Sequence, residues 1–171
     1  MIKTSFITDK DINSISLEAN LFYILMWMFS DDYGVTVNSN RTLLGDLYPH
    51  RESVTEKDIV IWKEELIDIG AIIECEYNDV PLLVIRKWED HQKVPNPSKK
   101  RHIPANSLAQ IIALYEDNIS GNKDYLEAND GLIKVYLMKE NKNKNKKRIY
   151  RKILVSKNKS TNTTLHRAEG Y

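Results

Sequence analysis

The pattern of apolar and polar positions divides the first ninety residues into helices and strands. Residues 17–29 are almost wholly apolar, which predicts a buried central helix with Ser16 as its N-cap. This run is shorter than the ~18 residues that suggest a membrane span. The turn sequence at 31–34 ends the helix, and residues 35–37 are expected to form a minimal strand. A short second helix, which Pro49 closes, contains the apolar positions Leu43, Leu44 and Leu47.

Signals at both ends mark a third helix. Thr55 and Asp58 form a variant of the capping box, with Asp in place of the usual Glu or Gln. Gly70 occupies the position after the helix at which a left-handed residue is favoured. Between these signals, apolar side chains recur at helical spacing: Ile59, Trp62, Leu66 and Ile69.

Two β-prone segments follow this helix directly. Residues 71–77 and 82–88 are expected to pair as a hairpin around the turn signal at 78–81. The order helix, strand, helix, helix, strand, turn, strand is that of a winged helix-turn-helix, an α+β fold. We therefore predict a winged-helix domain over residues 1–90 with a C-terminal extension, in which the hairpin is the wing.

The chain changes character after residue 90. Residues 91–105 are basic and contain spaced prolines, which predicts a linker or extended arm. Residues 106–117 show helical spacing, and a short helical region is expected to reach residue 138. Its second, weaker helix is expected to include Leu132, Ile133, Val135, Tyr136 and Leu137. Residues 139–171 form a low-complexity tail rich in Asn and Lys, which is typical of disordered chain ends.

The distribution of charge changes how this organisation is interpreted. The 171 residues carry a net charge of only +1. The tail at 139–171 holds eleven basic and two acidic residues, a net charge of +9, whereas residues 1–138 hold 14 basic and 22 acidic residues, a net charge of −8. A basic tail on an acidic body favours contact with nucleic acid, although a solvated end without function has the same composition.

Little in the sequence points to catalysis or to a metal. Cys75 is the only cysteine, and we expect it to be a small buried hydrophobe. The four histidines lack metal-ligand spacing, and no phosphate-binding glycine loop or nucleophile motif is present. We expect a protein that is not an enzyme, binds no metal or cofactor, and lies in the cytoplasm without contact to a membrane.

Six short motifs carry a resemblance to a known family. They are Phe6–Ile12, Leu21-Phe22-Tyr23, Asp31-Asp32-Tyr33-Gly34, Leu66–Ile72, Trp88 with His91-Gln92-Lys93, and Pro97-Ser98-Lys99 with Pro104. Over about residues 5–104 the chain resembles phage-encoded replication proteins, the replisome organisers and replication initiators with an N-terminal winged helix. The resemblance implies binding to double-stranded origin DNA inside a bacterial host cell and contacts with host or phage replication proteins. Such proteins commonly continue into a further helical domain, which residues 105–138 match only in part.

Winged-helix proteins usually place their third helix in the major groove, and this predicts where DNA contacts lie. The candidate DNA-binding residues on the second and third helices are Asn40, Arg41, Thr42, Lys57 and Lys63. The end of the hairpin and the basic linker add Arg86, Lys87, Lys93, Lys99, Lys100 and Arg101.

Acidic residues argue against simple insertion of the third helix into a groove. Residues 55–70 carry two basic and five acidic residues, and the hairpin adds Glu74, Glu76 and Asp79. Acids on a face toward phosphates would weaken binding. Either these acids face away from DNA, or the linker supplies the contacts.

Two other functions fit the same fold, because a fold does not fix a function. The acidic third helix favours a protein-interaction module, for example a phage protein that binds and inhibits a host factor. A transcriptional regulator is a further alternative. A homodimer is also compatible with the sequence, with the helix at 106–117 as a candidate interface.

Overall fold

A computed structural model describes residue 6 and residues 8–117, 125–128 and 132–136. The chain divides into two units, residues 1–138 and 139–171, and every described residue belongs to the first. The predicted low-complexity tail therefore lies outside the described residues.

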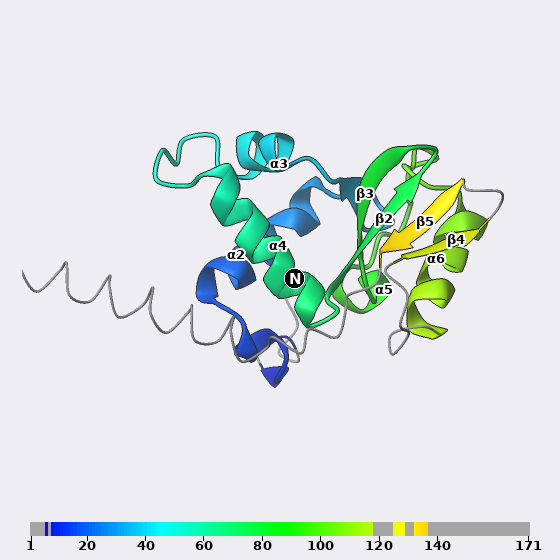
Figure 1. The fold of residues 1–171 in the computed structure, drawn as a ribbon, viewed down its shortest axis with the longest axis horizontal. Helices are drawn as coiled ribbons and strands as arrows, with labels where there is room; N and C mark the ends of the chain where they lie inside the picture. The colour runs from blue at the N-terminus through cyan, green and yellow to red at the C-terminus, as the bar shows by residue number, and fades with distance from the viewer. Residues whose placement is uncertain (1–5, 7, 118–124, 129–131, 137–171) are drawn as a thin grey trace, which may run out of the picture. The chain divides into compact units, whose positions relative to one another are not determined.

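The first part of this unit is a winged helix-turn-helix (Figure 1). Its helices are η1 (Ile12–Ser14), a single 3-10 turn, and α2 (Leu17–Phe29), α3 (Asn40–Leu47) and α4 (Glu56–Asp68). Its strands are β1 (Val35–Val37), β2 (Ile72–Tyr77) and β3 (Val80–Ile85). Both β1 and β2 pair antiparallel with β3. The order of elements is the one predicted from the sequence, and the α+β winged-helix fold is confirmed.

Local signals in the sequence set the ends of these elements. The Ser16 hydroxyl accepts a hydrogen bond from the Ala19 amide at the start of α2. Thr55 and Asp58 form the capping box of α4, in which the Thr55 amide donates to Asp58 Oδ2 at 2.8 Å. Gly70 follows α4 with a φ of 66°, the left-handed conformation that glycine adopts without strain.

The wing differs from the predicted hairpin in the length of its turn. Only Asn78 and Asp79 connect β2 to β3, with φ angles of 53° and 59°. Two successive residues with positive φ give the tight turn that matches the twist of paired strands. Val80 and Pro81, which were expected in the turn, therefore belong to β3.

The prediction of a helix around residues 132–137 is wrong. Its described part is a strand, β5 (Ile133–Tyr136), which pairs with β2 and with a further strand, β4 (Tyr125–Ala128). Ile133 and Val135 are fully buried while Lys134 and Tyr136 are not, which is the two-residue period of a strand. The sheet thus has five strands in the order β1-β3-β2-β5-β4.

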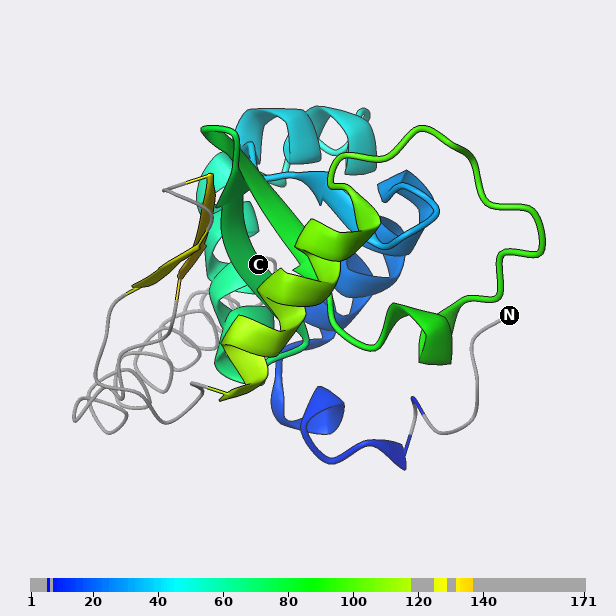
Figure 2. The same cartoon turned by 90° about the vertical axis from the view of Figure 1, so that its right-hand side faces the viewer.

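Helices cover both faces of the sheet. One face packs against α2 and α4 through a core that includes Phe22, Leu66, Leu83 and Ile85. The other face packs against α6 (Ala105–Asp117), which crosses the sheet in Figure 2 and buries Ile111 and Tyr115 there. The apolar side of this helix, a candidate dimer interface from the sequence, is therefore used within the unit. No helix in the described part of the chain is long and apolar enough to cross a membrane.

A short helix, α5 (Trp88–His91), links the hairpin to the basic segment that precedes α6. The imidazole of His91 stacks on Trp27 with ring centroids 4.8 Å apart. Its Nε2 atom lies 3.2 Å from the Tyr23 hydroxyl. These contacts fix α5 against α2, so the start of the basic segment has a defined position.

Candidate nucleic-acid interface

Residues 31–34 form a rigid loop between α2 and β1. Oδ1 of Asp31 accepts hydrogen bonds from the amides of Tyr33 and Val35, at 3.0 and 2.9 Å. Gly34 has a φ of 76°, and the Trp88 ring lies 2.8 Å from the place where a Cβ atom would stand. The Trp88 indole N–H donates to the Asp32 carbonyl at 2.9 Å. Hydrogen bonds to the Asp31 side chain and the contacts of Trp88 in α5 therefore hold the loop in place.

The basic segment between α5 and α6, residues 92–104, is tied to this loop, and we call it the strap. The Ser98 amide donates to Oδ2 of Asp32 at 2.6 Å, and the Tyr33 hydroxyl donates to the Ser98 carbonyl at 2.9 Å. The His102 amide donates to Oδ2 of Asp31 at 3.0 Å. The strap has no helix or strand of its own, as the prolines predict, but it is anchored rather than free.

The anchored strap presents four of the candidate cations. Lys93, Lys99 and Lys100 are exposed. The guanidinium of Arg101 lies over the Tyr33 ring at 3.6 Å from its centroid, a cation–π contact that leaves the group half-buried. Next to them, Ile103 is fully buried in the core under α6. Lys99, Lys100 and Arg101 thus project from a backbone that is held at Ser98 and at His102.

The second group of candidates lies on the helix-turn-helix. Arg41 and Thr42 in the first turn of α3, and Lys57 in the first turn of α4, are exposed. Asn40 is half-buried, and its side-chain oxygen is buried without a hydrogen-bond partner. Arg41 and Lys57 are therefore the candidate cations on α3 and α4 that are exposed to solvent.

Two other candidates are held inside the fold. Lys63 of α4 donates to the Asn38 side chain at 2.6 Å, and burial lowers the pKa of its ammonium group. Arg86 lies over the Tyr115 ring at 5.8 Å and 3.9 Å from the Glu116 carboxylate. Lys87, the next residue, is exposed in a left-handed conformation. Lys63 and Arg86 are therefore structural links, which the sequence alone did not reveal.

Several of the acids that argued against DNA binding also have structural partners. Glu65 is buried and accepts a hydrogen bond from the Ser16 amide at 2.7 Å, so it caps α2. Asp58 belongs to the capping box. The acids of α4 that face solvent are Glu56, Glu64 and Asp68. The negative charge on the outer face of α4 is thus smaller than the sequence count suggests.

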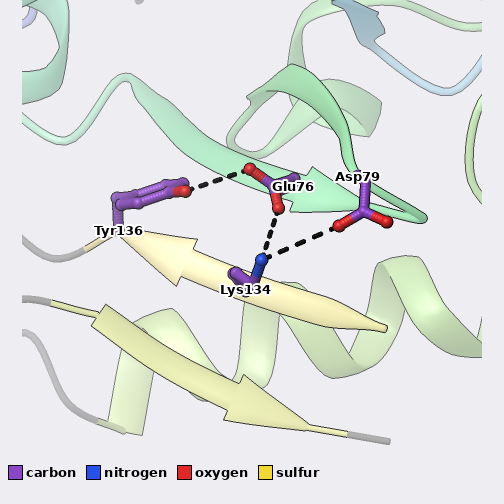
Figure 3. A network of polar contacts seen from close by, with 4 residues as sticks. All are labelled: Glu76, Asp79, Lys134 and Tyr136. Atoms are coloured by element: carbon purple, nitrogen blue, oxygen red, sulfur yellow. Dashed lines mark hydrogen bonds and ion pairs between the residues drawn. The ribbon is translucent and has the colours of Figure 1, made fainter. Parts of the chain in front are cut away.

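The acids of the wing are largely paired as well (Figure 3). Lys134 of β5 donates to Glu76 of β2 at 2.7 Å and lies 3.8 Å from Asp79, while the Tyr136 hydroxyl donates to the other oxygen of Glu76 at 3.1 Å. Hydrogen bonding from Lys134 lowers the pKa of the Glu76 carboxyl. The neighbouring Glu74 accepts from the Asn38 side-chain amide at 2.6 Å. This network fastens β5 to the wing.

Comparisons with known proteins add one weak likeness. No protein-family model matches the chain, and no curated protein matches it. A solved structure described as the N-terminal domain of a DNA binding protein shares 16% identity, with a TM-score of 0.39. The match covers 69% of this chain and 85% of that one.

The residues that sequence reasoning missed are the anchors rather than the cations. Asp31, Asp32 and Tyr33 appeared only as a motif, and nothing local indicated that they hold residues 98–102. No group of three or more His, Cys, Asp or Glu side chains within the described ranges is arranged to hold a metal ion.

Proposed function

We propose that this protein binds double-stranded DNA in the initiation of phage DNA replication, with the strap as its main contact to phosphates. The observation that carries the proposal is the anchored strap, where Lys99 and Lys100 project from a backbone that is held at Ser98 and His102. Cations on a preorganised segment contact phosphates without first ordering the chain, which favours affinity.

Sequence selection is assigned to the helix-turn-helix. Arg41 and Lys57 are exposed at the starts of α3 and α4, and an arginine can form two hydrogen bonds to a guanine edge in the major groove. In this division of roles, the strap sets affinity and the two helices choose the sequence. The replication context rests on the resemblance of residues 5–104 to phage replication proteins.

The proposal is tested with the full chain and three double variants, each measured against duplex DNA over a range of salt. The slope of log K against log salt is negative, and each lost phosphate contact reduces its magnitude by about 0.9. Lys99→Ala with Lys100→Ala should therefore reduce the slope by about two. Lys144→Ala with Lys146→Ala in the tail is the matched control and should change binding less.

The third variant separates the contacts that select the DNA sequence from those that bind phosphates. Arg41→Ala with Lys57→Ala should reduce the preference for sequences selected from a random duplex library by more than the strap variant does. Absence of DNA binding by the full chain would refute the proposal. An unchanged salt slope in the strap variant would remove the strap from it.

A protein-interaction module is the second candidate function. The observation that favours it is the outer face of α4, where Glu56, Glu64 and Asp68 are exposed while Lys63 is turned to Asn38. Such a face suits a basic partner better than phosphates. A full chain that binds a host replication protein but no DNA would support this function and exclude the first.

A further inference from the structure

The outer side of α2 carries an apolar stripe. The inner side of this helix buries Phe22, Tyr23 and Met26 in the core. On the opposite side, Leu17 is 82% exposed, Met28 is 74% exposed and Leu21 is 48% exposed. Exposed apolar side chains that cluster in this way, rather than occurring singly, mark an interaction surface.

The spacing of the stripe is that of a helix-pairing seam. Leu17, Leu21, Ile24 and Met28 are separated by four, three and four residues. This alternation places successive side chains in line along one edge of a helix and is the pattern of two helices that pack together. Glu18 is the only charged residue in α2, so the seam has almost no charge to repel a second apolar helix.

A hollow of about 290 Å³ lies beside this seam. Leu21, Val54 and Trp62 supply its apolar wall, and Glu18, Arg51 and Asp58 also line it. Tyr48 contributes to the lining, is only 8% exposed, and has a hydroxyl with no hydrogen-bond partner among the described residues. Burial raises the pKa of this hydroxyl to about 12.

We propose that the seam of α2 and the adjoining hollow form the interface of a two-fold symmetric homodimer. A two-fold interface uses the same patch on both subunits, so the patch must carry both protrusions and a recess for them. Here the exposed Leu17 and Met28 and the hollow lie on the same patch. Lining charges of opposite sign, Glu18 and Arg51, also fit a second copy, because Glu18 can meet Arg51 of the partner subunit.

A stable dimer needs a larger contact than the seam alone. A stable interface buries about 800 Å² on each partner, which is more than the four seam residues of one short helix provide. The hollow and the turn between α3 and α4 extend the contact beyond α2. This inference is independent of the proposed DNA binding, because no candidate DNA-binding residue belongs to the patch.

The test measures the oligomeric state of the full chain by sedimentation equilibrium over a wide concentration range. The natural protein should form a dimer. Leu17→Gln with Met28→Gln should raise the dimer dissociation constant by at least tenfold, with an unchanged far-UV circular dichroism spectrum because both side chains are exposed. Ile61→Gln on α4 is the matched control, since Ile61 is 47% exposed and lies outside the patch, and it should leave the dimer unchanged.

A milder variant tests the hollow separately. Arg51→Ala removes the exposed cation placed to meet Glu18 of the partner subunit and should weaken the dimer about fivefold. A protein that is monomeric at all concentrations would overturn the proposal. So would a Leu17→Gln, Met28→Gln variant that dimerises as tightly as the natural protein, or an Ile61→Gln variant that loses the dimer to the same extent.

Discussion

The backbone amide of Ser98 donates a hydrogen bond of 2.6 Å to the carboxylate of Asp32, a residue 66 positions earlier in the chain. This bond and the pairing of His102 with Asp31 make the strap a part of the folded unit. Any ligand that meets Lys99 or Lys100 finds a backbone that folding has already ordered. The entropy of ordering this segment is lost on folding and not again on binding.

Replacing Asp32 by Ala should loosen the strap without unfolding the unit. The loss of one solvent-exposed hydrogen bond shifts local opening by about 1 kcal/mol, which is roughly fivefold in the open population. Cleavage by trypsin after Lys99, Lys100 and Arg101 should become faster by a similar factor. Asp79→Ala, at the exposed tip of the wing, is the control and should leave cleavage of the strap unchanged. Equal cleavage rates in the natural protein and the Asp32 variant would show that the anchor does not hold the strap in solution.

Two glycines should respond in opposite ways to the same substitution. Gly34→Ala places a Cβ atom 2.8 Å from the Trp88 ring at a φ of 76°, so we expect a loss of about 2–4 kcal/mol in the free energy of unfolding. Gly45 lies within α3, and apart from the backbone of that helix no atom lies within 4 Å of the corresponding position. Gly45→Ala should therefore raise the free energy of unfolding by about 0.5–1 kcal/mol. Urea denaturation measures both, and equal effects of the two changes would contradict the close packing of Trp88 on Gly34.

The pairing of Glu76 with Lys134 should appear in the pH dependence of stability. The pKa of Glu76 is lowered in the folded state, so its contribution is present above the unfolded pKa of about 4.3 and is lost as pH falls through the lower, folded value. The difference in unfolding free energy between the natural protein and Glu76→Gln should be largest near pH 7 and shrink below about pH 4.

Urea denaturation at a series of pH values measures this difference. Glu52→Gln, which removes a carboxylate from the exposed turn between α3 and α4, is the matched control. If the difference for Glu76→Gln stays constant from pH 7 to pH 3, the ion pair contributes nothing to the free energy of unfolding.

Cys75 should be unreactive in the folded protein. Its side chain is fully buried under α6, and burial raises the pKa of its thiol to about 12, so little thiolate exists at pH 8. We expect an aromatic disulfide reagent to give no measurable reaction until urea unfolds the chain, and then one thiol per molecule. Rapid reaction of the native protein would show that α6 separates readily from the sheet.

The elements that the sequence predicted well are those with local signals. Ser16, the Thr55 and Asp58 pair, and Gly70 each act on backbone groups within a few residues, so their effects can be identified without a structure. The strand β5 could not be recognised in this way. Its alternation covers only four residues, and its stability depends on pairing with β2, nearly sixty positions away. An apolar run of this length fits a helix or a strand equally well.

The sequence predicted which basic residues the candidate site contains, but it did not predict how they are held. Arg41, Lys57, Lys99 and Lys100 are exposed as expected, whereas Lys63 is captured by Asn38, a contact across 25 positions that no local pattern indicates. The motifs that carry the resemblance to phage replication proteins also contact one another. Asp32 binds Ser98, and Gly34 packs against Trp88. Those motifs therefore mark the architecture that holds the strap in place.

The pairing of β5 with β2 limits where this chain can be divided. By composition the winged helix ends near residue 90, but a chain cut there would lose α6 and β5 together. Ile73 and Cys75, now fully buried, would face water, and the backbone of β2 would become a bare sheet edge available to other chains. The smallest fragment that keeps this sheet intact extends to Tyr136, so the wing and the segment after the strap have to be expressed and tested together.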